Sequence, residues 1–507
     1  MDLGLKWNAN SDDSKKEREE LDKLQPSKHL KELSIWSYGG TRFPDWFGDN
    51  SLSNLVFLTL SDCKNCVLLP PLGILPSLKK LGIIGLSGIV VIGSEFYGNG
   101  SSSSSGIIPF SSLETLIFEN MKRWEEWDCN IVTGAFPCLE ELVIDSCPNL
   151  KECLPEKLSR LMQLRISECR QLVSSVSLGP PIQYLHLSDC GKLRFNYQPS
   201  TLRLLKIGGQ YMEGSMLEWI EHILSHTSLE SLVIEECPTM NITLGCCYNF
   251  LLSLDITGSC ESLTTFPLDY FPKLLTLELK HCTNLEMISK EHEHDCSLTS
   301  LIIKWCPKFV SFPKGGFFAP KLEHFQLYML ENLKSLPECM HTLFPTLTKL
   351  KISNCPQLES FSNGGLPSSL IRMKLDTCSK LLIVSLKCAL GINTSLNRLS
   401  IICVDVESFP EEGLLPVSLT YLHISCCLNL KKLDNKGLCH LSALQELHLL
   451  NCPELQCLPV EGLPKSISTI EILHCSLLKQ RCKKPNGEDW GKISHIECVI
   501  IDRFRCN

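Results

Sequence analysis

The chain has 507 residues, with 48 basic and 56 acidic side chains, and its net charge of −8 gives no basic footprint for nucleic acid. No apolar run approaches the roughly 18 residues of a membrane span, and residues 1–28 lack the apolar core of a signal peptide. We therefore expect a cytoplasmic chain, with the nucleus as a second compartment, that binds neither membranes nor nucleic acid.

The first 29 residues are expected to form an incomplete N-terminal rung and linker. Leu3–Trp7 resembles half of a strand, a charged stretch follows at Ser11–Glu20, and a short helix is predicted near Leu21–Leu24. A stack of repeats normally carries a polar cap on its first turn, and residues 1–29 contain no sequence typical of such a cap.

One phrase, L-x-x-L-x-[LI]-x-x-C, recurs between residues 30 and 480, and Leu139 to Cys147 is a clean copy. With degenerate copies included, it occurs about 19 times at a mean spacing of about 24 residues. Its first positions are residues 30, 55, 78, 113, 139, 161, 182, 202, 229, 251, 274, 298, 322, 347, 370, 396, 419, 444 and 467. Leucine-rich repeats show spacings of roughly 20–29 residues, whereas helical repeats and propeller blades are longer.

Within the phrase, positions four and six point to one face of a short strand, and positions three, five and seven point to the other. In the copy at residue 139, Leu142 and Ile144 face inward and Glu141 faces outward. No repeat can bury its own apolar face, so neighbours must stack. The predicted fold is an α/β solenoid: a leucine-rich-repeat horseshoe with a long parallel β-sheet on its concave side and an irregular or short-helical convex side.

Three segments depart from the regular spacing. The serine-rich stretch Gly98–Gly106 is predicted to be a flexible convex loop. Residues Glu213–His226 carry apolar side chains at helical spacing and are predicted to form a convex amphipathic helix. Residues 481–507 follow the last repeat, and we expect their apolar side chains to fold over the final rung as a C-terminal cap.

Twelve of the 29 cysteines occupy position nine of the phrase. This position lies just past the strand, where the side chain turns inward and can bond to backbone groups of the turn. We expect a structural ladder of buried, reduced thiols at Cys63, Cys147, Cys169, Cys190, Cys237, Cys282, Cys306, Cys355, Cys378, Cys427, Cys452 and Cys475. Disulfides between rungs are the alternative, because strands roughly 4.8 Å apart lie within bridging distance, although the side chains run parallel.

Other clusters favour structural interpretations. Cys63 and Cys66 have redox or zinc spacing, yet no second pair lies at zinc distance. Residues 291–296 are dense in metal ligands but lack helical H-x-x-x-H spacing, so a solvated loop is expected, with weak adventitious metal binding as the alternative. Trp124 and Trp127 are expected to wedge a long spacer against the core. No nucleophile-elbow, zinc-protease or nucleophile–base motif is present, so we expect no enzyme activity.

Four segments have sequences that are more specific than the repeat phrase. They are residues 38–49 (YGGTRFPDWFGD), 60–98, 110–128 (FSSLETLIFENMKRWEEWD) and 481–502 (RCKKPNGEDWGKISHIECVIID). Together with the cysteine-bearing repeats between them, they resemble the leucine-rich-repeat region of plant nucleotide-binding immune receptors, the coiled-coil class of NB-LRR disease-resistance proteins. The resemblance covers nearly the whole chain.

The nucleotide-binding motif of that family, G-x-x-x-x-G-K-[ST], is absent. Gly191–Lys192 and Gly491–Lys492 are the only Gly-Lys pairs, each is followed by an apolar residue, and neither has a glycine five places upstream. ATP or ADP is therefore expected only on a nucleotide-binding domain that this chain lacks. We expect no cofactor or metal on the chain itself.

The resemblance implies a function in plant defence: recognition of a pathogen effector or a modified host protein, and regulation of a nucleotide-binding switch. The implied partners are proteins, including the nucleotide-binding domain of an immune receptor. One alternative is a truncated decoy or regulator of full-length receptors. Another is a leucine-rich-repeat adaptor of a ubiquitin ligase, although residues 1–29 are too short to hold the F-box that such an adaptor needs.

The outward strand positions separate charge along the array. Early repeats present Glu119, Glu141 and Asp145, whereas later repeats present mainly cations. Neighbouring like charges repel, so we expect an acidic partner surface to dock on the later repeats, with Trp36 as a further aromatic anchor; a solvated strand face is the alternative. The candidate partner-binding residues are Lys280, Lys304, Trp305, His324, Tyr328, Lys349, Lys351, Arg372, Lys374 and Arg398.

Overall fold

A computed structural model describes most of the chain. The residues outside the description are 1, 9–13, 25, 49, 99–107, 130–133, 152–153, 156–157, 177–180, 196–199, 211–217, 221, 225–227, 241–246, 292–295, 362–364, 379, 391–394, 503 and 506–507. Residues 99–106 of the expected serine-rich loop and most of the expected metal-ligand-dense loop fall among them.

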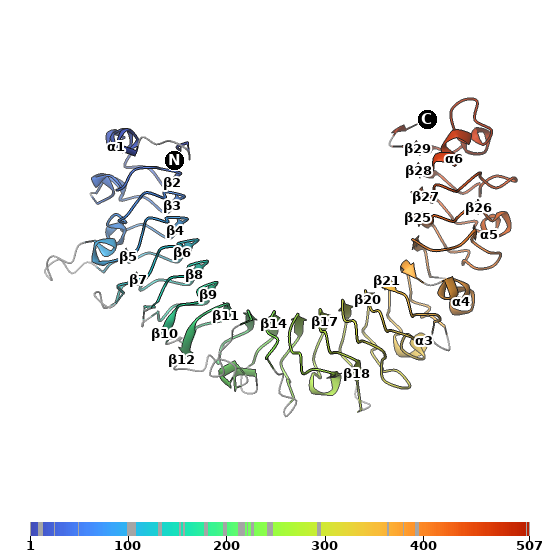
Figure 1. The fold of residues 1–507 in the computed structure, drawn as a ribbon, viewed down its shortest axis with the longest axis horizontal. Helices are drawn as coiled ribbons and strands as arrows, with labels where there is room; N and C mark the ends of the chain where they lie inside the picture. Colours follow the sequence, from blue (N-terminus) through green and yellow to red (C-terminus); the bar gives the residue numbers. More distant parts are fainter. Residues whose placement is uncertain are drawn as a thin grey trace. The chain divides into compact units, whose positions relative to one another are not determined.

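The chain divides into two compact units, residues Met1–Met240 and Asn241–Asn507, and each is a parallel β-solenoid (Figure 1). The main strands of the first unit are β1 (Asp2–Lys6), β2 (Glu32–Trp36), β3 (Phe57–Ser61), β4 (Lys80–Ile84), β6 (Thr115–Glu119), β8 (Glu141–Asp145), β9 (Gln163–Ser167), β11 (Tyr184–Ser188), β13 (Leu204–Gly208) and β14 (Ser231–Glu235). Each pairs in parallel with the next along the chain.

The second unit has the same organisation. Its main strands are β15 (Ser253–Thr257), β17 (Thr276–Lys280), β19 (Ser300–Lys304), β20 (His324–Tyr328), β21 (Lys349–Cys355), β22 (Arg372–Cys378), β23 (Arg398–Ile402), β25 (Tyr421–Ser425), β27 (Glu446–Leu450), β28 (Thr469–Leu473) and β29 (Cys498–Ile501). All of these pair in parallel with their neighbours, and β30 (Phe504–Arg505) then pairs antiparallel with β29. The predicted solenoid with a long parallel sheet is confirmed in both units.

Strand register follows the repeat phrase position by position. Leu142 of β8 pairs with Leu164 of β9, and both occupy position four. Along β8 the buried residues are Leu142 and Ile144, with partly exposed residues between them, because successive side chains on a strand point to opposite faces. The apolar core therefore lies on one face of each sheet, and positions three, five and seven form the other, exposed face.

Position eight of the phrase has a backbone requirement that the sequence pattern did not reveal. The residue at this position has a positive φ in all 19 repeats; for example, φ is 56° at Ser37 in the first repeat and 52° at His474 in the last. This left-handed conformation turns the chain off the strand, and it costs about 1–2 kcal/mol in residues other than Gly, Asn and Asp. The turn directs position nine back into the core.

Helical turns and short strand ladders form the side opposite the main sheets (Figure 1). The ladders are β5 (Val91–Ile92) with β7 (Glu126–Trp127), β10 (Val173–Val176) with β12 (Lys192–Phe195), β16 (Thr265–Pro267) with β18 (Met287–Ser289), and β24 (Ser408–Phe409) with β26 (Lys432–Leu433). The helices there are η1 (Asp45–Phe47), η2 (Asn50–Leu52), η3 (Leu72–Ile74), η4 (Ser94–Tyr97), η5 (Leu268–Tyr270), α3 (Met340–Leu343), α4 (Lys380–Leu390) and α5 (Asn435–Cys439).

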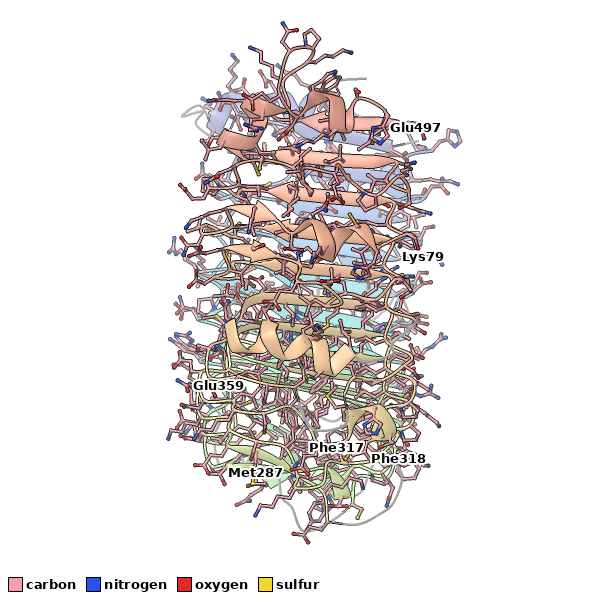
Figure 2. All side chains as sticks on the ribbon, turned by 90° about the vertical axis from the view of Figure 1, so that its right-hand side faces the viewer. Lys79, Met287, Phe317, Phe318, Glu359 and Glu497 are labelled. Atoms are coloured by element: carbon pink, nitrogen blue, oxygen red, sulfur yellow. The ribbon has the colours of Figure 1, made fainter. Side chains whose placement is uncertain are left out.

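The second unit shows two distinct flanks when viewed onto its outer side (Figure 2). Met287 and Glu359, which come after the main strands β17 and β21, lie toward one margin. Phe318 and Glu497, which come before the main strands β20 and β29, lie toward the other. The expected helix at residues 213–226, in the first unit, is helical at 218–220 and 222–224, and its remaining residues lie outside the description.

The N-terminal helix differs from the prediction. Helix α1 covers Ser14–Lys23 and so includes much of the stretch that was expected to be only a charged linker. Leu21 is fully buried, its carbonyl accepts a hydrogen bond from Trp46 Nε1 at 3.2 Å, and Glu17 accepts one from the Gly39 N–H. One buried face is enough to fix a helix whose other side is charged. The sequence pattern predicted only the last turn of this helix, because only that turn is apolar.

The two tryptophans of the early spacer wedge against the core as expected. Trp124 and Trp127 are fully buried, and their ring centroids lie 5.7 Å apart. Trp127 Nε1 donates to the Tyr97 hydroxyl at 2.9 Å, which satisfies its buried N–H. Stacked phenylalanines, including Phe110 and Phe136 at 4.8 Å, fill the space around them.

Candidate protein-binding face

The position-nine cysteines line the interior of each unit, and other residues, such as Leu330 and Val404, occupy position nine in the remaining repeats. All twelve are buried and carry free thiols. Each thiol donates to the carbonyl two residues earlier, as Cys169 does to Ser167 at 3.2 Å. Many also reach the previous rung, as Cys190 does to the Ile166 carbonyl at 3.0 Å. These bonds give the turn carbonyls a partner inside the core.

Burial sets the chemistry of these thiols. It raises the pKa of Cys355 to about 11 and that of Cys378 to about 12, because a thiolate is poorly solvated in an apolar interior. At neutral pH Cys355 and Cys378 are therefore protonated, and their contribution is structural. Cys63 and Cys66 likewise carry free thiols in the core.

Cationic side chains gather on three consecutive strands of the second unit. Position three places Lys349 of β21 beside Arg372 of β22 and Arg372 beside Arg398 of β23. Position five places Lys351 beside Lys374. We call these five residues the basic patch. At about 5 Å in water each neighbouring pair repels by roughly 0.8 kcal/mol.

Carboxylates offset little of this charge. Lys374 Nζ lies 3.2 Å from Asp376 Oδ2 on the same strand. Lys349 Nζ lies 3.5 Å from His324 Nε2. Among the described residues, Lys349, Lys351 and Arg372 have no ion-pair partner, so the patch presents uncompensated charge to solvent.

The predicted cation Lys280 does not belong to this patch. Its ammonium lies 3.0 Å from Asp255 Oδ2 and 2.5 Å from Glu278 Oε2. Burial lowers its pKa, but the hydrogen bonds to the two carboxylates outweigh burial and raise it overall. Its charge is locally neutralised. Lys304, its register neighbour on β19, has no ion-pair partner among the described residues.

The predicted aromatic anchors form a second group at the strand ends. Trp305 stacks on His281 with ring centroids 4.5 Å apart and meets the edge of Tyr328 at 5.0 Å. Trp305 is 36% exposed and has a φ of 53°, an unfavourable conformation for a bulky residue. His324 lies at the opposite end of β20, and its Nδ1 atom is buried without a hydrogen-bond partner in the described structure.

Tyr421 was missed by sequence reasoning. It occupies position three of β25, next in register to Arg398, whose guanidinium carbon lies 4.1 Å from the ring centroid. The same positional rule that found the cations predicts this neighbour. Beyond Tyr421 the row changes sign at Glu446, which together with Glu471 holds His448. The basic patch therefore has a defined end.

Neighbouring side chains partly compensate the negative charge of the acidic residues predicted on the first unit. Asp145 pairs with Arg165 at 3.0 Å and accepts a hydrogen bond from Ser167 at 2.7 Å. Glu141 lies 3.3 Å from the Thr115 hydroxyl. Trp36, the remaining predicted anchor, lies on β2 and is 37% exposed.

Neither a metal centre nor a membrane helix is found in the described part of the chain. No group of three or more His, Cys, Asp or Glu side chains there could hold a metal ion. No described helix is long and apolar enough to cross a membrane. Residues 292–295, at the centre of the expected ligand-dense loop, lie outside the description.

The repeats, the cysteine rows and the exposed strand face define a leucine-rich-repeat domain. A solved structure described as CroV588, a circular leucine-rich-repeat protein, matches 94% of this chain and 74% of its own with a TM-score of 0.51 and 14% identity. At that identity the match concerns the fold alone. Residues 1–86 match the family model of R13L1/DRL21 leucine-rich repeats.

Plant disease resistance proteins are among the relatives of the chain. A putative disease resistance protein of Arabidopsis thaliana is 28% identical over 96% of this chain and 47% of its own length. A putative disease resistance RPP13-like protein 1 of the same plant is 32% identical over 61% of this chain and 24% of its own. The chain thus spans about half or less of these relatives, and it is a leucine-rich-repeat region related to plant disease resistance proteins.

Proposed function

We propose that this chain is the non-enzymatic recognition region of a cytoplasmic plant immune receptor, and that it binds a pathogen effector or a modified host protein. The basic patch is the observation that carries the proposed binding mode. Its partner would present an acidic surface to β21, β22 and β23. Association of such surfaces is accelerated by long-range attraction and weakened by salt.

Energetics support a binding role for the patch. Like charges side by side on a sheet reduce stability, and a stable scaffold would gain from a carboxylate at Lys351 or Arg372. The repeat structure does not require either residue, because positions three and five do not enter the core. An acidic partner would relieve this repulsion on binding, so the same residues that weaken the free fold would strengthen the complex.

Regulation of a nucleotide-binding switch is the second part of the proposal. Its support is the relationship to disease resistance proteins that are longer than this chain. In this scheme ATP or ADP would be held by a separate nucleotide-binding domain. The leucine-rich-repeat region would restrain that domain until a partner binds.

The test is affinity capture from plant leaf extracts with three versions of the chain. One is unaltered, the second carries Lys349→Glu, Lys351→Glu, Arg372→Glu and Lys374→Glu, and the third is a matched control. The control carries four Lys→Glu changes at exposed sites away from the strand face, at Lys314, Lys321, Lys334 and Lys465. The two variants have the same net charge, so any difference between them reports position and not charge.

A comparison of extracts from infected and healthy leaves distinguishes specific recognition from non-specific binding. We expect the unaltered chain and the control to capture a protein that is present, or present in modified form, only in the extract of infected leaves. The patch variant should not capture this protein. Circular dichroism of all three chains checks that the fold is intact. Equal capture by the patch variant and the control would contradict the proposed binding mode.

A further inference from the structure

Two neighbouring rungs of the second unit carry cysteine at position eight. Cys403 follows β23 and Cys426 follows β25, and both have the left-handed backbone of that position, with φ of 52° and 54°. The residues directly before them, Ile402 and Ser425, are register partners. The two cysteines therefore lie side by side at the same edge of the sheet.

Their spacing suits a covalent bridge. Neighbouring strands lie about 4.8 Å apart, inside the Cα separation of about 4.4–6.8 Å that disulfides span. The Cys403 N–H donates to the Ser425 carbonyl at 2.8 Å, which holds the two turns together. The side chain of Cys426 is held in the same row, because Asn451 Nδ2 donates to its sulfur at 3.7 Å.

Accessibility separates this pair from the position-nine ladder. Cys403 is exposed and Cys426 is partly exposed, whereas Cys427 and Cys452 are buried. The buried thiols donate to turn carbonyls, as Cys427 does to Ser425 at 3.4 Å. A dissolved oxidant can therefore reach the position-eight pair in the folded protein and cannot reach the ladder.

We propose that Cys403 and Cys426 form an oxidisable dithiol that closes to a cross-rung disulfide on reaction with a low-molecular-weight disulfide such as oxidised glutathione. One cysteine thiolate attacks the glutathione disulfide, giving a mixed disulfide and releasing one glutathione. The second thiolate attacks the mixed disulfide at the protein sulfur and releases the other glutathione. Both thiol protons end on glutathione, so two cysteines are oxidised and one disulfide is reduced.

The reaction has a predictable pH dependence. Partial burial, together with contact with the Cys426 thiol, raises the pKa of Cys403 above its ordinary value. The side chains that face this sulfur from neighbouring strands are Thr377, Asp376 and Cys426. Because the thiolate is the attacking species, bridging should accelerate as the pH rises from 7 to 9.

The test uses the reduced full chain incubated with glutathione and oxidised glutathione, quenched with acid and alkylated. Trypsin does not separate the two cysteines, because no Lys or Arg lies between residues 398 and 431. Cleavage after glutamate does, at Glu407, Glu411 and Glu412. We expect mass spectrometry to find the peptide containing Cys403 joined to the peptide containing Cys426.

Single variants provide the controls. Cys403→Ser and Cys426→Ser should each abolish the joined peptides, and Cys439→Ser, which alters an exposed thiol elsewhere, should leave them unchanged. Circular dichroism checks the fold of each variant. The proposal is overturned if both thiols of the unaltered chain carry separate glutathione adducts at equilibrium, if they remain reduced, or if Cys426 is joined to Cys427 instead.

Discussion

Arg398 lies over the ring of Tyr421, with its guanidinium carbon 4.1 Å from the ring centroid. The two residues occupy the same repeat position on β23 and β25. The contact fixes the last cation of the basic patch and keeps its charge at the exposed face. It also marks where the positive row ends, because Glu446 follows at the next strand.

Replacing Tyr421 with leucine should remove this contact and free the Arg398 side chain. A cation over an exposed aromatic ring contributes about 0.5–1 kcal/mol, so we expect the free energy of unfolding of Tyr421→Leu to fall by about that amount in urea titrations. Tyr421→Phe keeps the ring face and should lose less than half as much. Equal losses for the two variants would show that the hydroxyl, and not the ring, is the relevant group.

Two lysines on the exposed face should respond to substitution in opposite directions. Lys351 lies beside Lys374 without a carboxylate partner among the described residues, so Lys351→Glu should stabilise the fold by about 0.3–1 kcal/mol. Lys280 is held by Asp255 and Glu278, and Lys280→Met should destabilise it by roughly 1–2 kcal/mol because two carboxylates lose their partner. Thermal or urea unfolding measures both, and a destabilised Lys351→Glu would contradict our description of the patch.

Asp489 fixes the C-terminal cap, residues 481–507, which contains α7 (Trp490–Ile493) and follows α6 (Ser476–Arg481). Its carboxylate is 1% exposed and accepts hydrogen bonds from the Leu458 N–H at 3.0 Å and Arg481 Nε at 3.2 Å, with Lys492 Nζ at 2.8 Å. Asp489→Ala should cost roughly 3 kcal/mol, because it leaves the buried Leu458 N–H without its acceptor and removes one of the partners of Arg481 and of Lys492. Asp489→Asn keeps one acceptor and should cost less.

The same carboxylate should make cap stability depend on pH. Burial raises the pKa of Asp489, but the bonds from Lys492, Arg481 and the Leu458 N–H outweigh burial and lower it overall. A depressed pKa means that its contribution is complete above the unfolded value of about 3.9 and is lost as the pH falls below it. Hydrogen exchange of β28 and β29 between pH 3 and pH 6 follows this loss, which should be absent in Asp489→Asn.

The buried cysteines should weaken the fold at alkaline pH. The pKa of Cys355 is about 11 and that of Cys378 is about 12 in the folded chain, against about 8.5 in an unfolded one. Between these values only the unfolded chain releases the proton, so each cysteine should cost up to about 1.4 kcal/mol per pH unit above pH 8.5. Urea titrations from pH 7 to pH 10 measure the slope. Cys355→Ala should have a shallower slope, and an unchanged slope would contradict this assignment.

Periodicity predicted the fold well because it reports which face of a strand is buried. The first positions found by spacing, from Leu30 to Ile467, are all buried, and neighbouring repeat strands pair at equal positions, as Leu142 does with Leu164. The helix α1 was misplaced because its burial depends on contacts with Gly39 and Trp46, more than 20 residues away. No local pattern carries that information.

The sequence predicted which side chains of the candidate site lie on the exposed strand face. It did not predict which of them form ion pairs with neighbouring residues. Sequence reasoning placed Lys280 with the free cations because it counted only charge sign at outward positions. Its neutralisation depends on the reach of a side chain to the preceding strand, where Asp255 lies. Charge patterning also did not separate Trp305 from the basic patch. Trp305 follows the end of β19, whereas Lys349 and Arg372 lie at the beginning of β21 and β22.

The most direct test of the account is a titration of the captured partner, once purified, against the three chains at 50 and 200 mM salt. We expect the unaltered chain and the control with substitutions away from the strand face to bind equally and more weakly at high salt. The patch variant should lose at least about 100-fold in affinity, or about 2.7 kcal/mol. Undiminished binding by the patch variant would contradict recognition through Lys349, Lys351, Arg372 and Lys374.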